Sequence, residues 1–158
     1  MHRMVVTLCA AFAAACAGGE DEPPPGPDAG ATDSVHAAEA RDDLATSLIA
    51  RVGDGSVTFV LSVTNAGGRP VRLDFNSGQR FDVSVTDAAG EGVWHWSADK
   101  SFLQSLGTET IEPGATLDYE ATWEGVPPGT YSATGEITAT NVDIRHAVEV
   151  QVPAPGQA

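Results

Sequence analysis

The sequence predicts an all-β protein, an antiparallel β-sandwich of about seven to nine strands that follows an N-terminal leader and a linker. From residue 44 onward, apolar and polar residues alternate with a period of two, as in strands with one buried face. Turns rich in Gly and Pro separate these segments at regular intervals. No segment after the leader keeps a helical period of 3.6. This combination is typical of an immunoglobulin-like architecture.

The expected strands follow one another in a simple order. Residues 44–52 open the domain, which we place at 44–158, and Gly53-Asp54-Gly55 turns the chain. One helical turn is expected at 102–106, where Phe102 and Leu106 are four residues apart and would cover one end of the core. The Cys-Trp-Cys core of antibody domains is absent, so only the architecture is immunoglobulin-like. The further strands are expected at 57–64, 71–75, 81–85, 92–97, 117–123, 131–137 and 148–152.

Residues 1–15 are expected to be a lipoprotein signal peptide. A weakly positive start precedes an apolar run at 5–15, about 11 residues long, whereas a membrane-spanning helix needs about 20. The run ends in Ala13-Ala14-Ala15-Cys16, which resembles a bacterial lipobox, although its first residue is usually Leu. The alternative is an ordinary signal peptidase site at Ala-x-Ala.

The cysteines favour the lipoprotein interpretation. Cys9 and Cys16 are the two cysteines of the chain, and Cys9 lies inside the leader. An exported protein normally uses cysteines in disulfides, and a single one at the start of the mature chain has no partner. We therefore expect Cys16 to carry a lipid that anchors the protein to the cell envelope, with no other membrane contact. In a host with two membranes, Ala17 in place of Asp favours the outer one.

Residues 16–43 are expected to be a disordered linker rich in proline and acidic residues. Eight acids and one base lie between positions 20 and 43, and 14 acids against 6 bases follow from residue 44, a net charge of about −8. This balance argues against nucleic acid, whose phosphates require Lys or Arg. It also argues against electrostatic adhesion to anionic lipid.

A set of motif residues follows one order along the middle of the domain: Ser77, Gly78, Gln79, Phe81, Asp82, Trp94, Trp96, Ser97, Phe102, Pro113, Gly114, Trp123, Gly129 and Tyr131. In this order they resemble the intracellular proteinase inhibitor (BsuPI) family. The resemblance covers roughly residues 57–137 and implies an immunoglobulin-like fold and inhibition of a subtilisin-type serine protease. Within the motif we expect Gly78 to supply a positive φ, Gln79 to bond backbone and Asp82 to satisfy backbone donors.

No motif for catalysis, metal or cofactor is visible. His36, His95 and His146 are widely separated, without the spacing of zinc ligands. Gly-x-Ser-x-Gly, a phosphate-binding glycine loop and an EF-hand loop do not occur. We therefore expect a monomer that binds and does not catalyse, without cofactor or metal.

Three binding functions remain open. A loop at 98–108 could inhibit a serine protease by offering Lys100, Phe102, Leu103 and Leu106, unless Phe102 and Leu106 belong to the core. The domain could instead be an envelope adaptor that binds a protein through its sheet edge or end loops. It could also bind a small ligand or carbohydrate on Trp94 and Trp96, although such an indole pair usually packs in the core.

Overall fold

The computed structural model describes residues 42–154. Nine strands lie within this part of the chain, and all paired strands are antiparallel. The predicted all-β class and strand number are confirmed. β6 lies in a region for which the sequence predicted no strand. The strands are β1 Leu44–Gly53, β2 Ser56–Asn65, β3 Val71–Phe75, β4 Phe81–Asp87, β5 Gly92–His95, β6 Gly107–Ile111, β7 Thr116–Glu124, β8 Gly129–Ile137 and β9 Ile144–Val152.

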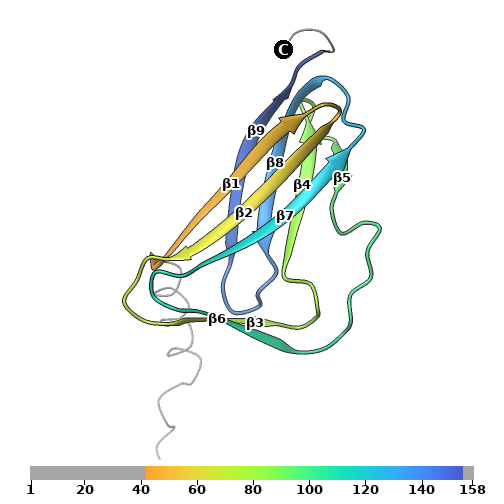
Figure 1. The fold of residues 1–158 in the computed structure, drawn as a ribbon. Helices are drawn as coiled ribbons and strands as arrows, with labels where there is room; N and C mark the ends of the chain where they lie inside the picture. Colours follow the sequence, from red (N-terminus) through yellow and green to blue (C-terminus); the bar gives the residue numbers. More distant parts are fainter. Residues whose placement is uncertain (1–41, 155–158) are drawn as a thin grey trace, which may run out of the picture.

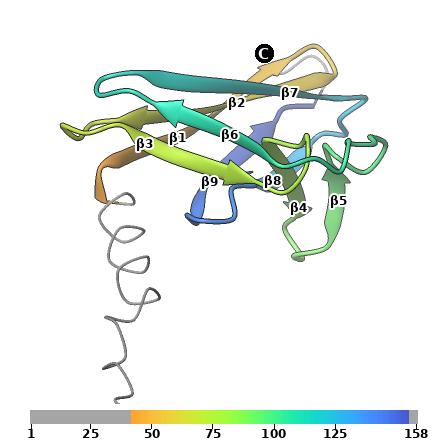
Figure 2. The same ribbon diagram turned by 90° about the horizontal axis from the view of Figure 1, so that it is seen from below.

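The strands form three sheets. A three-stranded sheet has the order β1-β2-β7, a four-stranded sheet has the order β5-β4-β8-β9, and β3 pairs with β6. Figure 1 shows the two larger sheets face to face, with the β3-β6 ribbon across their lower end. The view from below in Figure 2 shows the β1-β2-β7 layer over the layer that contains β4, β8 and β9.

The core is built from the inward-facing residues of both sheets. Every second residue of β2, from Val57 to Asn65, is buried, as the alternation of its sequence predicts. Each Val, Leu or Phe side chain that is fully buried stabilises the fold by about 1.5–3 kcal/mol. Core side chains at most 2% exposed include Phe59, Leu61, Leu73, Phe75, Val83, Val85 and Ile111.

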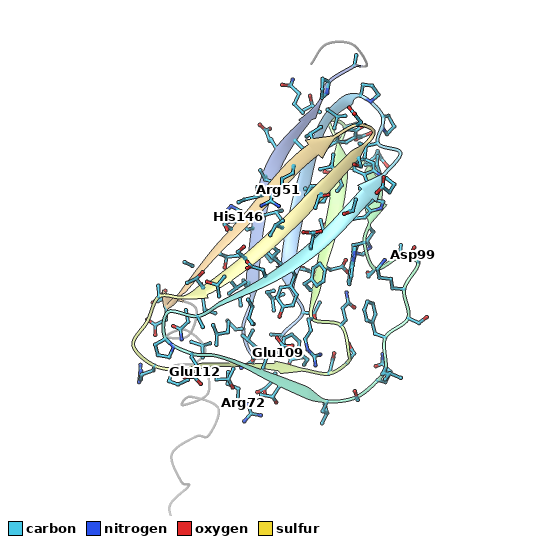
Figure 3. All side chains as sticks on the ribbon, in the orientation of Figure 1. Arg51, Arg72, Asp99, Glu109, Glu112 and His146 are labelled. Carbon is cyan, nitrogen blue, oxygen red and sulfur yellow. The ribbon has the colours of Figure 1, made fainter. Side chains whose placement is uncertain are left out.

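The two lateral sides of the sandwich differ. On one side β1 and β9 lie next to each other, and Figure 3 labels Arg51 on β1 and His146 on β9 at this side. On the other side, β7 and β5 are the edge strands of their sheets and have no further partner strand among residues 42–154. The chain leaves β5 on this open side, swings away from the sheets and returns as β6 (Figure 1).

Two side chains fix the ends of strands, and no pattern in the sequence indicated these roles. Asn65 is fully buried, and its Nδ2 donates to the carbonyls of Arg69 and Ile111, 2.7 and 2.8 Å away. It thereby ties the end of β2 to the next turn and to β6. Tyr131 Oη donates to the carbonyl of Pro127 at 2.8 Å, a bond from strand to preceding corner like the tyrosine corner of immunoglobulin-type sandwiches.

Two local expectations were wrong. Residues 101–106 contain no helical turn, and Leu106 is 89% exposed, so it does not cover the core. Gly78 does not have a positive φ; the glycines that do are Gly55, Gly90, Gly114 and Gly125. The two segments contact each other instead: Gly78 N–H donates to the carbonyl of Leu103 at 2.8 Å. Within the described range, no helix is long and apolar enough to span a bilayer.

Candidate functional site

The segment between β5 and β6, residues 96–106, carries the most exposed large apolar side chains of the described chain. We call it the β5–β6 loop. Leu103 is 81% and Leu106 is 89% exposed, whereas the other exposed large hydrophobic residues, among them Ile49, do not exceed 50%. The loop is shorter than the predicted 98–108 segment at its C-terminal end, because Gly107 and Thr108 already belong to β6. Figure 3 shows Asp99 on its outer bend.

A buried carboxylate holds the start of this loop. Asp82 of β4 is 6% exposed, and its Oδ2 accepts hydrogen bonds from Gln79 Nε2 at 2.9 Å and Ser97 Oγ at 2.6 Å. The same oxygen lies 2.9 Å from His95 Nε2, and the other oxygen accepts from the backbone N–H of Val83 at 2.8 Å. Asp82 therefore connects the turn before β4, the end of β5 and the first residues of the loop. Because hydrogen bonds to a buried charge are stronger than those between neutral groups, this connection is firm.

Aromatic rings hold the next part of the loop. The ring of Trp96 lies 4.1 Å from that of Phe81 and 5.9 Å from that of Phe102, measured between centroids. Phe102 is half-buried and turns inward, unlike the leucine that follows it. Lys100 Nζ lies 4.8 Å above the Trp96 ring and 3.1 Å from Asp99 Oδ1. The Lys100 hydrogen bond and charge lower the pKa of the Asp99 carboxyl.

The backbone of Leu103 is fixed although its side chain is free. The carbonyl of Leu103 accepts from the N–H of Gly78 at 2.8 Å and from that of Ser105 at 3.1 Å. A Cβ at position 78 would lie 3.6 Å from both Leu103 N and Leu103 O, an ordinary van der Waals distance, so the two backbones lie side by side here. The Ser77-Gly78-Gln79 turn thus holds the middle of the loop through a backbone hydrogen bond.

A second polar cluster anchors the end of the loop. Arg80 Nε donates to Glu109 Oε1 at 2.7 Å, and Arg80 Nη1 donates to the carbonyl of Ser77 at 2.8 Å. A Cβ at Gly107 would lie 2.7 Å from Arg80 Nη2, so the guanidinium fills the space beside this glycine. Tyr119 Oη donates to Glu109 Oε2 at 2.8 Å. Burial, followed by the bond to Glu109, raises the pKa of Tyr119 well above its usual value.

Trp94 packs with the core and not as an open platform. Its ring stacks with Phe59 and Trp123, at centroid distances of 6.0 and 5.9 Å. A groove of about 650 Å³ runs along the open side, where residues of β5 and the loop face Thr122 of β7. Parts of Trp94 and Trp96 line this groove. The side chains that face it are therefore a mixture of half-buried indoles and exposed polar groups.

The polar groups near the loop are not arranged for covalent catalysis. Ser97 and His95 both contact the same oxygen of Asp82, so the carboxylate lies between them. In a catalytic triad the imidazole lies between the serine and the carboxylate and takes the serine proton. Among residues 42–154 no group of three His, Cys, Asp or Glu side chains could hold a metal ion.

Most of the residues that resembled a family motif fall into two groups. One group surrounds the β5–β6 loop, and Arg80, Glu109 and Tyr119 join it there without having been predicted. Arg80 stands inside the motif, but nothing in the sequence indicates its partner 29 residues later. The other group lies around the end of β7, where Trp123 contacts both Trp94 and Tyr131. Pro113 and Gly114 belong to neither group, because they form the turn between β6 and β7 at the opposite end of β7. Cys16 lies outside the described residues. The first group consists of Ser77, Gly78, Gln79, Phe81, Asp82, Trp96 and Ser97, and the second of Trp94, Trp123, Gly129 and Tyr131.

Solved structures resemble the fold only distantly. A penta-heme cytochrome c552 from Thermochromatium tepidum matches with a TM-score of 0.48 and 10% identity over 74% of this chain and 41% of its own. CsgH of R. palustris matches with a TM-score of 0.37 and 17% identity over 67% of this chain and 91% of its own. The CARDB domain of a Pyrococcus furiosus protein matches with a TM-score of 0.40 and 17% identity, over 70% and 94%. No curated protein sequence matches.

The family comparison is specific. The model of the family described as BsuPI, intracellular proteinase inhibitor, matches residues 44–142, which is more than half of the chain and extends from the start of β1 to just before β9. This range contains Asp82, the whole β5–β6 loop and both of its anchoring clusters. The chain belongs to the BsuPI intracellular proteinase inhibitor family.

Proposed function

We propose that this protein inhibits a subtilisin-type serine protease by inserting its β5–β6 loop into the active-site cleft. One observation carries the proposal: Leu103 and Leu106 are 81% and 89% exposed on a loop whose start, middle and end are each anchored. Two highly exposed leucines, three residues apart on one anchored loop, are side chains that a partner's apolar pockets could bury.

The anchors explain how such a loop would bind tightly. Association costs conformational entropy for every backbone segment and side chain that becomes ordered, and a loop that is already ordered loses less. Here Asp82, the Trp96–Phe102 ring pair and the Leu103 carbonyl fix the backbone before binding. The two leucines are then free to enter apolar pockets of the protease. The biochemical act is therefore binding, without catalysis.

A titration tests this function. Purified protein is added in increasing amounts to a subtilisin-type protease of known active-site concentration, and residual peptidase activity and the intact mass of the protein are measured. We expect activity to fall in proportion to added protein and to vanish near one equivalent, with the protein uncleaved. Unchanged activity at micromolar protein, or rapid cleavage within the loop, would refute inhibition.

We also propose that the protein is exported and carries its lipid on Cys16. Support comes from the apolar leader, the Ala13-Ala14-Ala15-Cys16 sequence and the lack of a partner for a mature Cys16. Growth with a radiolabelled fatty acid should label the wild-type protein and leave Cys16→Ser unlabelled. Equal labelling of both forms, or label in neither, would contradict lipidation at this residue.

A second function is favoured by one separate observation, the unpaired edge of β5 beside the 650 Å³ groove. An extended segment of another envelope protein could add to such an edge as a further strand. The groove includes the first residues of the β5–β6 loop but neither Leu103 nor Leu106, so the two functions use different parts of this side. Val93→Pro on β5 would impair strand addition and leave protease inhibition intact, whereas loss of inhibition in this variant would place the protease on the β5 edge.

A further inference from the structure

We infer that Leu106 is the residue that enters the primary specificity pocket of the target protease, with the Leu106–Gly107 peptide bond facing the protease nucleophile, and that Leu103 fills a second pocket. The inference rests on the proposed function and specifies its chemistry. The target is then an endopeptidase with an apolar primary pocket and another apolar pocket for the residue three positions earlier.

The backbone carbonyls distinguish between the two exposed leucines. In a complex that resembles bound substrate, the carbonyl before the attacked bond enters the oxyanion hole, where two protease N–H groups donate to it. The carbonyl of Leu103 already accepts hydrogen bonds from Gly78 and Ser105 inside the protein. The carbonyl of Leu106 accepts none from any residue between 42 and 154. Leu106 is therefore the leucine whose carbonyl is available.

The other large side chains of the loop are already engaged. The Phe102 ring packs on Trp96 at 5.9 Å. The Lys100 ammonium lies over the Trp96 ring and beside Asp99. Either residue would have to break these contacts before it could enter a pocket, whereas the side chain of Leu106 is 89% exposed. Burial of this leucine in an apolar pocket therefore requires no such loss.

The residue that follows Leu106 also fits this role. Gly107 pairs with Phe75 in the β3-β6 ribbon, and Arg80 packs beside it. The chain on the C-terminal side of the bond is thus fixed by a strand, and the chain on the N-terminal side is fixed by the Leu103 carbonyl and the Trp96–Phe102 pair. A bond supported on both sides presents a rigid backbone to the nucleophile and lowers the entropy cost of docking.

The spacing of the two leucines indicates which substrate pockets of the target protease are apolar. Leu103 lies three residues before Leu106 and is 81% exposed, with Gln104 and Ser105 between them. The immobilised Leu103 carbonyl keeps this second side chain at a fixed place relative to the first. A protease with a single apolar pocket would gain from Leu106 alone, whereas one with two apolar pockets would gain from both.

The test measures inhibition constants of the purified wild-type protein and of Leu106→Ala, Leu106→Lys, Leu103→Ala and the control Ile49→Ala. Two proteases are used, a subtilisin-type enzyme that prefers large apolar residues and a trypsin-type enzyme that cleaves after Lys or Arg. For the subtilisin-type enzyme, Leu106→Ala should weaken inhibition about 100-fold, Leu103→Ala about 10-fold, and Ile49→Ala less than about 2-fold. Leu106→Lys should gain inhibition of the trypsin-type enzyme.

The variants separate failure of the inference from failure of the function. The leucine side chains are exposed, so unfolding midpoints should equal that of the wild type and exclude misfolding as a cause. If the wild type inhibits and Leu106→Ala inhibits equally well, the assignment of Leu106 is wrong. If Leu106→Lys gains nothing against the trypsin-type enzyme, it is also wrong. If the wild type inhibits neither protease, the proposed function fails, and this inference fails with it.

Discussion

The two connections on either side of β6 keep their shape by different means. The turn between β6 and β7 is short and is held by backbone hydrogen bonds: Gly114 adopts a φ of 77°, Ala115 N–H donates to the carbonyl of Glu112 at 2.9 Å, and Gly114 N–H donates to the carbonyl of Asn65 at 2.8 Å. The β5–β6 loop has turn bonds only near its start, such as that from Lys100 N–H to the carbonyl of Ser97 at 3.1 Å, and otherwise depends on distant partners such as Asp82 and Gly78. A turn of the first kind only reverses the chain, whereas the second kind holds exposed leucines in a fixed place.

The largest effect is expected for Asp82→Ala. The substitution leaves Gln79 Nε2, Ser97 Oγ and the N–H of Val83 without their buried acceptor. The free energy of unfolding, measured by urea denaturation, should fall by about 2–3 kcal/mol. The backbone amides of residues 96–106 should also exchange their hydrogens with solvent faster than in the wild type. The control Asp118→Ala removes an exposed carboxylate that binds Ser62 and should cost less than about 1 kcal/mol. Equal losses in both variants would contradict a special role of Asp82.

Phe102→Ala should separate loop order from global stability. The half-buried ring packs only on Trp96 among the aromatic residues, so unfolding should become easier by about 1–2 kcal/mol. Inhibition of the protease should weaken more than about tenfold, because the loop must then be ordered on binding. Ser101→Ala, at the exposed neighbouring position, serves as the control. If Phe102→Ala inhibits the protease as strongly as the wild type although its loop is disordered, anchoring of the loop is unimportant.

Gly114→Ala tests the local turn. Alanine at a φ of 77° is strained, and the free energy of unfolding should fall by about 1 kcal/mol with inhibition unchanged. Gly68→Ala is the matched control, because the space at Gly68 is open and its φ is not positive; the expected change is below about 0.5 kcal/mol. A loss of inhibition in Gly114→Ala would mean that the turn acts on the loop.

The smallest effect concerns pH and the end of the loop. Burial and Glu109 raise the pKa of Tyr119, so above pH about 10 the unfolded chain loses this proton while the folded chain keeps it. The unfolded state then binds fewer protons, and the free energy of unfolding decreases as pH rises. For Tyr119→Phe, the free energy of unfolding should decrease less steeply than that of the wild type between about pH 9 and about pH 11. The measurement is urea denaturation repeated at intervals of about half a pH unit. Parallel curves would contradict a perturbed Tyr119.

All strands of the described residues except β6 were predictable, because their information is local. The alternation of Val57, Phe59, Leu61 and Val63 places one face of β2 in the core whatever its partners are. The Pro113-Gly114 turn was predictable for the same reason. The family resemblance identified the residues around Asp82. Asp82 was expected to bind backbone, which describes only one of its four partners.

The loop could not be predicted because its determinants lie far apart in the chain. Phe102 and Leu106 have helical spacing, but the ring of Phe102 packs on that of Trp96, whereas Leu106 is exposed to solvent. The carbonyl of Leu103 is bound by Gly78, 25 residues earlier, and Arg80 by Glu109, 29 residues later. No pattern of period two or 3.6 contains such pairs, so their identification required the three-dimensional structure.

Hydrogen exchange of the protein alone and with one equivalent of a subtilisin-type protease tests the central claim most directly. Protection is measured by mass spectrometry on peptides that separate the β5–β6 loop from the β6–β7 turn. We expect the amides of residues 96–106 to become protected on addition of the protease, and those of residues 112–115 to remain unchanged. Protection elsewhere with none in the loop, or no change anywhere, would contradict the claim that this loop is the surface that meets the protease.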